Sequence, residues 1–125
     1  MSDDTRRTER VAGLVRTHVT ELIRRELGDV TLSELVVTSV EVSRDLSIAH
    51  ILVRSLAKED DLAGRRRLMG RLRKAAPRLR RALGPRIELR RVPELRFEFD
   101  TGADASARVA ELLAEIAKEP KGRGE

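Results

Sequence analysis

The sequence predicts an α+β fold of two layers, in which helices pack on one face of a three-stranded sheet. The first observation is the order of the apolar patterns along the 125 residues, which switch between the helical and the strand period. They predict the order α-β-β-α-α-β plus a C-terminal helix. The second observation concerns the connections. A short turn separates the first two strands, whereas helices connect the second strand to the third and must therefore cross one face of the sheet.

The first helix is expected at 4–27, because its apolar residues recur at spacings of three and four and form one stripe. This stripe consists of Val11, Leu14, Val15, Val19, Leu22, Ile23 and Leu27. Asp3 or Asp4 is expected to cap its start, and Gly28 stands where a glycine usually closes a helix.

Two strands are expected next, at 35–43 and 47–56, because both segments are rich in β-branched residues. The turn of residues 43–46 between them is short, so they should form an antiparallel hairpin. In the first strand the even-numbered positions are apolar or Thr, and the pattern predicts that they face the core.

The helical period returns at 60–83, with Leu62, Leu68, Met69, Leu72, Leu79 and Leu83. Pro77 interrupts this segment. A proline inside a helix costs about 3 kcal/mol, but it is tolerated at the first position of a new helix. The sequence therefore predicts two helices that meet at a kink of Ala75, Ala76 and Pro77. The second helix should end at Gly84-Pro85.

The third strand is expected from Ile87 to Phe99, where apolar residues alternate with charged ones. Pro93 inside it indicates an edge strand or a bulge, because proline cannot donate to the sheet ladder. Thr101 or Asp104 should cap a last helix, whose apolar side is Val109, Leu112, Leu113 and Ile116. A single domain at 1–118 and a disordered tail at 119–125 are expected.

Composition excludes several classes of protein. The chain has no cysteine, which removes disulfides, thiolate zinc sites and thiol nucleophiles. No apolar run approaches the roughly 20 residues that span a bilayer. The first ten residues are highly charged and lack the apolar segment of a signal peptide. These features predict a cytoplasmic protein without a membrane partner.

Catalytic groups do not converge in the sequence. His18 and His50 have no carboxylate partner that a motif identifies, and two histidines without cysteine make a poor metal site. Asp60 and Asp61 stand at the entrance of a helix, where carboxylates meet the helix dipole favourably. No phosphate-binding loop, nucleophile elbow or dinucleotide fingerprint is present. We therefore expect no enzyme, no catalytic residue, no metal and no cofactor.

Positive charge is concentrated in one segment. Residues 65–91 hold twelve Lys or Arg and one acidic residue, Glu88, a net charge of +11, which leaves −6 for the rest of a chain whose total is +5. Such segregation favours a polyanion-binding face over a merely solvated one. The residues expected to bind phosphate are Arg65, Arg66, Arg67, Arg71, Arg73, Lys74, Arg78, Arg80, Arg81 and Arg86. Aromatics make up only 2% of the chain, which excludes recognition by stacking on bases.

Three stretches, in this order, resemble the ribosome-binding factor A family. They are Arg10-Val-Ala12, the hairpin segment from Thr38 to Leu46, and Leu89 to Asp100 with its Val-Pro-Glu-Leu-x-Phe core. The resemblance covers about residues 6–116. It implies a type II KH fold and a maturation factor that binds the small ribosomal subunit and its ribosomal RNA during late assembly. KH domains usually clamp a nucleic-acid backbone with a Gly-x-x-Gly loop, whereas this family carries an Ala-x-Gly kink.

In this chain proline stands where the family's kink has glycine, so the flanking arginines are expected to carry more of the binding. The first hypothesis is therefore a small-subunit assembly factor that binds ribosomal RNA through an arginine-rich helix–kink–helix face and aids late RNA processing. The alternative is a protein-interaction module that docks an acidic partner. DNA binding is not expected, because no helix-turn-helix or dimer seam is evident, and we expect a monomer. Alanine at Arg71, Arg78 and Arg81 should weaken subunit binding and leave the fold intact.

Overall fold

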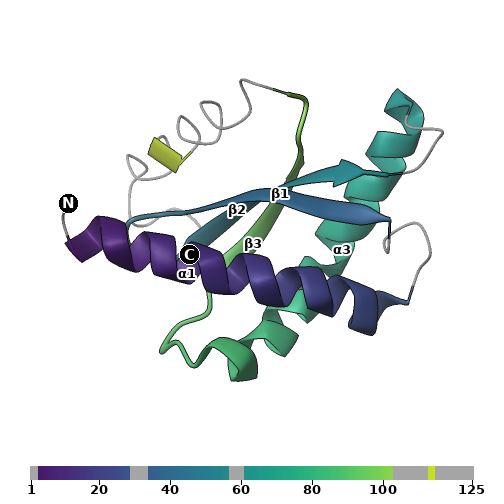
Figure 1. Cartoon of the computed structure of the whole chain (residues 1–125). Coiled ribbons are helices and arrows are strands. Elements are labelled where there is room, and N and C mark those ends of the chain that lie inside the picture. The colour runs from purple at the N-terminus through teal and green to yellow at the C-terminus, as the bar shows by residue number, and fades with distance from the viewer. Residues whose placement is uncertain (1–2, 29–33, 57–60, 103–112, 115–125) are drawn as a thin grey trace, which may run out of the picture.

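The computed structural model describes residues 3–28, 34–56, 61–102 and 113–114. Helix α1 (Asp3–Leu22) continues as a π-helical turn, η1 (Ile23–Leu27), and Gly28 closes it in the left-handed conformation, as predicted. Strands β1 (Leu35–Val42) and β2 (Ile48–Ser55) follow. Helix α3 (Leu62–Ile87) then leads to strand β3 (Glu94–Phe99). Figure 1 shows these elements as helices that lie against a small sheet.

The sheet has the order β1-β2-β3, with β2 in the centre. Strands β1 and β2 pair antiparallel, which confirms the predicted hairpin. Strand β3 pairs parallel to β2, because α3 carries the chain back before it enters the sheet again. The edge position predicted for the third strand is confirmed, and Pro93 directly precedes it.

The core lies between one face of the sheet and the two helices. Ala49, Ile51 and Val53 of β2 are fully buried and belong to one cluster with the apolar stripes of both helices. The opposite face of β2 presents Leu52, which contacts Leu113 instead. This arrangement confirms the predicted two-layer α+β class (Figure 1). The predicted C-terminal helix lies mostly outside the described residues, of which Leu113 and Ala114 are helical.

The prediction of two helices between the second and third strands is wrong, because α3 is one helix that contains Pro77 and Pro85. Both prolines are exposed, so water can satisfy the carbonyl groups that lose their helical partners. Beyond Pro77, the helix buries Leu79, Leu83 and Ile87. Burying such side chains stabilises by about 1.5–3 kcal/mol each, which together exceeds the cost of about 3 kcal/mol for a helix proline.

Two predicted boundaries therefore change, namely the end of the helix, predicted at Gly84-Pro85, and the start of the third strand, predicted at Ile87. Ile87 belongs to the last turn of α3 and not to the third strand, which begins only at Glu94. Its side chain continues the buried stripe of Leu79 and Leu83 at helical spacing. Glu88 then ends the helix with a φ of 48°.

The predicted orientation of the first strand is wrong in its first half. Leu35 and Val37 are buried, whereas Val36 is 37% exposed. The register shifts between Val37 and Ser39, so Thr38 is an extra residue in a β-bulge. A bulge reverses the alternation, and after it the even-numbered Val42 faces the core as predicted.

The start of α3 has a carboxylate where the sequence predicts one. Asp61 precedes the helix in an extended conformation, and its Oδ1 accepts a hydrogen bond from the backbone N–H of Gly64 at 2.7 Å. This is the usual role of an N-cap aspartate. Asp60 lies outside the described residues. Among the helices of the described ranges, none is long and apolar enough to cross a membrane.

Candidate nucleic-acid interface

The basic residues of α3 follow a seven-residue repeat. Three adjacent pairs stand at this spacing, namely Arg66-Arg67, Arg73-Lys74 and Arg80-Arg81. Seven residues make nearly two helical turns, so the pairs lie above one another in two neighbouring rows. Leu68, Leu72 and Leu79 occupy the buried side. The row of Arg67, Lys74 and Arg81 therefore lies opposite the core, and the row of Arg66, Arg73 and Arg80 lies on the flank of the helix.

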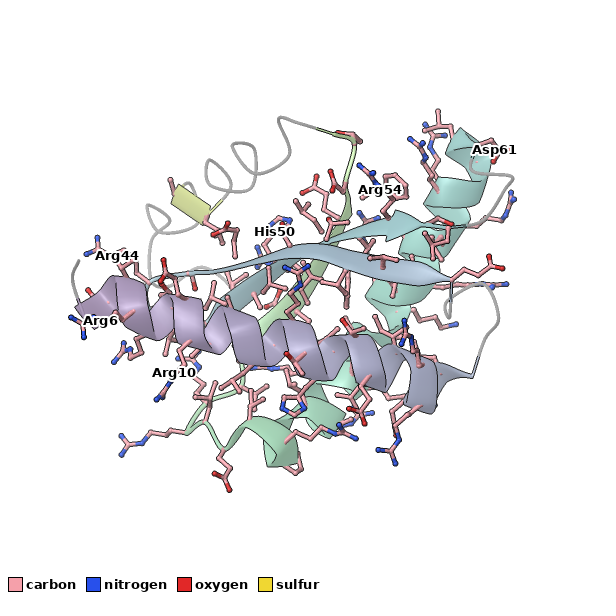
Figure 2. The ribbon with its side chains drawn as sticks, in the orientation of Figure 1. Arg6, Arg10, Arg44, His50, Arg54 and Asp61 are labelled. Atoms are coloured by element: carbon pink, nitrogen blue, oxygen red, sulfur yellow. The ribbon has the colours of Figure 1, made fainter. Side chains whose placement is uncertain are left out.

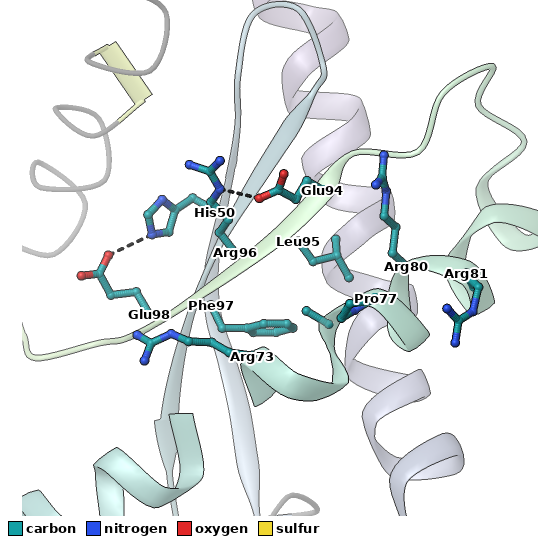
Figure 3. Close-up of a pocket in the computed structure, with 11 residues that line it drawn as sticks. His50, Arg73, Pro77, Arg80, Arg81, Glu94, Leu95, Arg96, Phe97 and Glu98 are labelled. Atoms are coloured by element: carbon teal, nitrogen blue, oxygen red, sulfur yellow. Dashed lines mark hydrogen bonds and ion pairs between the residues drawn. The ribbon is translucent and has the colours of Figure 1, made fainter. Parts of the chain in front are cut away.

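The row of Arg66, Arg73 and Arg80 borders β3. Here α3 and the free edge of β3 form a groove of about 760 Å³, which Figure 3 shows. Arg73, Arg80 and Arg81 form its wall on the α3 side, and Pro77 lies between them. The lining from the sheet consists of His50, Glu94, Leu95, Arg96, Phe97 and Glu98.

Arg80 also has a structural role in this groove. Its Nε and Nη2 both donate to the backbone carbonyl of Val92, at 3.1 and 2.7 Å. Val92 lies in the segment between α3 and β3, and its side chain lies where a Cβ added to Gly84 would meet it at 3.4 Å. Arg80 therefore ties this segment to the helix and sets the position at which β3 enters the sheet.

The side of α3 that faces α1 holds the two helices together. Nη2 of Arg78 donates to the backbone carbonyl of Glu26 at 2.6 Å. Nη1 of Arg86 lies 3.2 Å from Oε1 of Glu21, which also receives a hydrogen bond from Arg25. Arg86 and Arg25 hold the pKa of Glu21 below its ordinary value through hydrogen bonds and charge. The structure thus gives Arg78 and Arg86 contacts within the fold, and their contact with RNA stays a prediction.

Arg65, at the start of α3, lies on a different side of the helix from its neighbours Arg66 and Arg67. Its guanidinium carbon lies 4.4 Å from the ring centroid of Phe99, a cation–π contact. Arg71 is exposed on the helix, on the same side as Arg78. Neither residue belongs to the seven-residue repeat.

Five predicted cations remain directed toward solvent as a group, and they are Arg66, Arg67, Arg73, Lys74 and Arg81. Within the described ranges, none of the five forms an ion pair with a carboxylate. Their charge is therefore presented outward and together. Of the predicted kink residues, Ala75 and Ala76 pack against the core, whereas Pro77 is exposed in the groove.

His50 has a carboxylate partner that the sequence pattern did not reveal. It is 7% exposed, and its Nε2 lies 2.8 Å from Oε2 of Glu98. The parallel register places His50 opposite Arg96, so Glu98, two residues further along, shares its face of the sheet (Figure 3). The two residues are 48 positions apart, and only the pairing of β2 with β3 could have predicted their contact.

Comparisons with known proteins agree with this structure. The family model of ribosome-binding factor A matches residues 7–113. Ribosome-binding factor A of Desulforamulus reducens is 40% identical over 110 residues, which cover 88% of this chain and 89% of that protein. The protein of the same name from Sorangium cellulosum is 40% identical over 116 residues and covers 93% of each chain.

Two structures of ribosome-binding factor A resemble the fold of this chain. The crystal structure of ribosome-binding factor A from Thermus thermophilus matches with a TM-score of 0.62 and 27% identity, over 73% of this chain and 93% of that one. A model of the Thermus thermophilus protein, fitted into the cryo-EM map of its 30S complex, matches with a TM-score of 0.59 and 28% identity, over 73% of this chain and 94% of that one. The family model, which matches most of the chain, and the relatives that are 40% identical show that the chain belongs to the ribosome-binding factor A family.

Proposed function

We propose that this protein is an assembly factor that binds the ribosomal RNA of the free small ribosomal subunit and aids its late processing. Family membership supports a ribosome-binding role, and the Thermus thermophilus relative has been fitted into a map of a 30S complex. The observation that carries the RNA contact is the double row of cations on α3. Five of the six, all except Arg80, face solvent together and, in the described part of the chain, form no ion pair with a carboxylate.

The chemistry of this face suits phosphates better than bases. Arg67, Lys74 and Arg81 form the outer row, and guanidinium groups bind phosphate oxygens in pairs. The chain has only two aromatic residues; Phe97 is 4% exposed and Arg65 covers the ring of Phe99. Bases therefore find no exposed ring on which to stack, so affinity should depend on charge and fall steeply with salt.

Sedimentation of the protein with purified small subunits tests the proposal. We expect the unchanged protein to travel with the subunits, and the triple variant Arg67→Ala, Lys74→Ala, Arg81→Ala to bind more weakly. Loss of three phosphate contacts should reduce the slope of log affinity against log salt concentration by about 2 to 3. A control with Ala at Arg16, Arg44 and Arg54 removes the same charge from exposed positions outside α3 and should bind nearly normally.

Equal sedimentation of both triple variants at every salt concentration would refute the assignment of the RNA contact to α3. Binding to naked small-subunit RNA separates RNA from an acidic protein partner. The outer-row variant should lose affinity for naked RNA in the same proportion as for whole subunits. A loss confined to whole subunits would instead assign this face to a ribosomal protein.

A further inference from the structure

Strand β3 has a free edge beside α3. It is the last strand in the order β1-β2-β3, and among the described residues no strand pairs with its other side. The backbone N–H groups of Glu94 and Asp100, at the two ends of the strand, donate to carbonyls on the side of β2. Because the direction of these groups alternates along a strand, Leu95 and Phe97 direct their backbone N–H and C=O groups outward. Such an edge is a template to which an extended chain can add a strand.

Helix α3 runs alongside this edge in the opposite direction. Arg80 binds the carbonyl of Val92, directly before the strand, whereas Arg65 at the start of the helix contacts Phe99 at the end of the strand. From Arg65 to Arg80 the helix rises by about 22 Å, and an extended chain from Val92 to Phe99 spans about 23 Å. The two lengths agree, so the helix follows the strand throughout, and the groove of about 760 Å³ lies between them.

The α3 wall of this groove has a repeat of four residues. Arg73, Pro77 and Arg81 all line it, so a cation, an apolar ring and a second cation follow one another along the helix (Figure 3). The two arginines are about 12 Å apart along the helix axis. In the part of the chain that the structure describes, neither of them forms an ion pair with a carboxylate, and Pro77 between them is exposed.

An extended chain added to β3 would match this spacing. Every second side chain of a strand points to the same side, so the first, third and fifth side chains span about 13 Å. Acidic side chains at the first and fifth positions would reach Arg73 and Arg81, and an apolar side chain at the third would lie on Pro77. This pattern is the same in both chain directions, so it fits parallel and antiparallel addition alike.

The opposite wall of the groove favours a peptide over an RNA strand. Carboxylates of Glu94 and Glu98 line it, and they repel phosphates. Phe97, the aromatic residue that lines the groove, is buried and offers no ring to a base. The side chains of Glu94 and Glu98 lie on the side of the sheet that carries His50, which Figure 2 shows away from α1. They therefore do not oppose acidic side chains that face α3.

We propose that the groove between α3 and β3 binds an extended segment of a partner protein with the pattern acidic–x–apolar–x–acidic, which adds a strand to β3. The backbone of this segment pairs with the outward groups of Leu95 and Phe97, and its two acidic side chains pair with Arg73 and Arg81. The inference goes beyond the proposed function, because it assigns a protein partner to a groove that the RNA contact of the outer row does not require.

A synthetic peptide with the centre Glu-Thr-Val-Thr-Glu and flanking threonines tests the proposal by NMR on the full chain. Its backbone should protect the outward amides of the edge. At a peptide concentration about ten times the Kd, hydrogen exchange at Leu95 and Phe97 should slow by about tenfold. A peptide of the same composition, with the second Glu moved two positions toward the first, keeps the charge and loses the spacing. It should bind several times more weakly.

A pair of matched variants tests the contacts with α3. Arg73→Ala with Arg81→Ala should weaken binding of the peptide by about fivefold to tenfold, because two charge-assisted contacts are lost at an exposed site. Arg67→Ala with Lys74→Ala removes the same charge from the same helix outside the groove and should bind the peptide nearly normally. Equal affinity of the two double variants, or of the original and the shifted peptide, would overturn the proposal.

Two further outcomes would assign the groove to another occupant. Oligouridine of similar length is tested in the same exchange experiment, and protection of Leu95 and Phe97 by this RNA but not by the peptide would overturn the proposal in favour of RNA. Protection in the protein alone that rises with its concentration would overturn it in favour of a second copy of this chain. Neither outcome depends on sedimentation of the outer-row variant with small subunits, so failure of the proposed function is measured separately.

Discussion

Arg78 of α3 donates a hydrogen bond of 2.6 Å to the backbone carbonyl of Glu26, which lies in the π-helical turn at the end of α1. A charged donor on a backbone carbonyl typically stabilises by more than a neutral hydrogen bond, although exposure of Arg78 reduces the gain. We expect Arg78→Ala to lower the free energy of unfolding by about 1 kcal/mol. Urea unfolding measures this, with Arg67→Ala as a control that should be nearly neutral. Equal stability of both variants would contradict the structural role of Arg78.

The prediction that alanine at Arg71, Arg78 and Arg81 leaves the fold intact stays a prediction, but this contact means that the variant should also be less stable. A binding defect of that triple variant would combine lost phosphate contacts with a loosened contact between α1 and α3. The outer row of Arg67, Lys74 and Arg81 avoids this ambiguity.

The contact between Arg65 and Phe99 joins the start of α3 to the end of β3. A cation at 4.4 Å from a ring centroid contributes about 0.5–1 kcal/mol at a partly exposed site. A double-mutant cycle of Arg65→Gln and Phe99→Leu should therefore give a coupling energy of this size, measured by urea unfolding. Leu retains much of the apolar surface of Phe99. Strict additivity of the two substitutions would show that the ring and the guanidinium do not interact.

The hairpin turn between β1 and β2 predicts a specific pH dependence. Oδ1 of Asp45 accepts hydrogen bonds from the hydroxyl of Ser47 at 2.6 Å, from its N–H at 3.0 Å and from the hydroxyl of Ser43 at 2.8 Å. These bonds favour the charged carboxylate, and the hydroxyl of Ser47 above all lowers the pKa of Asp45. Because this pKa is lower in the folded than in the unfolded chain, the stabilisation is complete above the unfolded value of about 3.9 and is lost as pH falls through the folded value.

Asp45→Asn measures this contribution. The variant should be less stable than the unchanged protein near neutral pH, and the difference between their urea midpoints should shrink as the pH falls below about 4. Asp61→Asn is a suitable comparison, because Asn is also a good N-cap and should retain most of the capping bond. If the difference in urea midpoint between Asp45→Asn and the unchanged protein stays constant down to about pH 2, the charge of Asp45 does not contribute to stability.

The sequence predicted the first helix, the hairpin and the return of the chain through a helix to a third strand, because periodicity reports which side of each element is buried. It failed where two patterns coincide. Ile87 fits the helical stripe of Leu79 and Leu83 as well as the alternation that leads to Leu95, and burial against the core decided for the helix. Pro77 and Pro85 do not end the helix, although the sequence predicts that they do. Both prolines are exposed, and the neighbouring side chains of Leu79, Leu83 and Ile87 are buried in the core.

Other features depended on tertiary contacts that one sequence does not contain. The bulge at Thr38 reverses the alternation of buried and exposed residues in β1. The hydroxyl of Thr38 donates to the carbonyl of Leu52 on the neighbouring strand at 3.3 Å. The partner of His50 follows from the parallel pairing of β2 and β3. In the candidate site, the seven-residue repeat was visible in the sequence. Which arginines serve the fold was not, because Arg78 and Arg80 bind backbone carbonyls that no sequence pattern identifies.

Glu88 at the end of α3 offers a stabilising substitution. Its φ of 48° lies in the left-handed region, where glycine is favoured and other residues are strained by about 1–2 kcal/mol. Its carboxylate also stands at the negative end of the helix dipole. We expect Glu88→Gly to raise the free energy of unfolding by about 0.5–1 kcal/mol, once the greater freedom of glycine in the unfolded chain is counted. Glu88→Ala removes the charge and keeps the strained backbone, so it should stabilise less in the same urea experiment. An equal gain in both variants would assign the whole effect to the charge and contradict the argument from backbone strain.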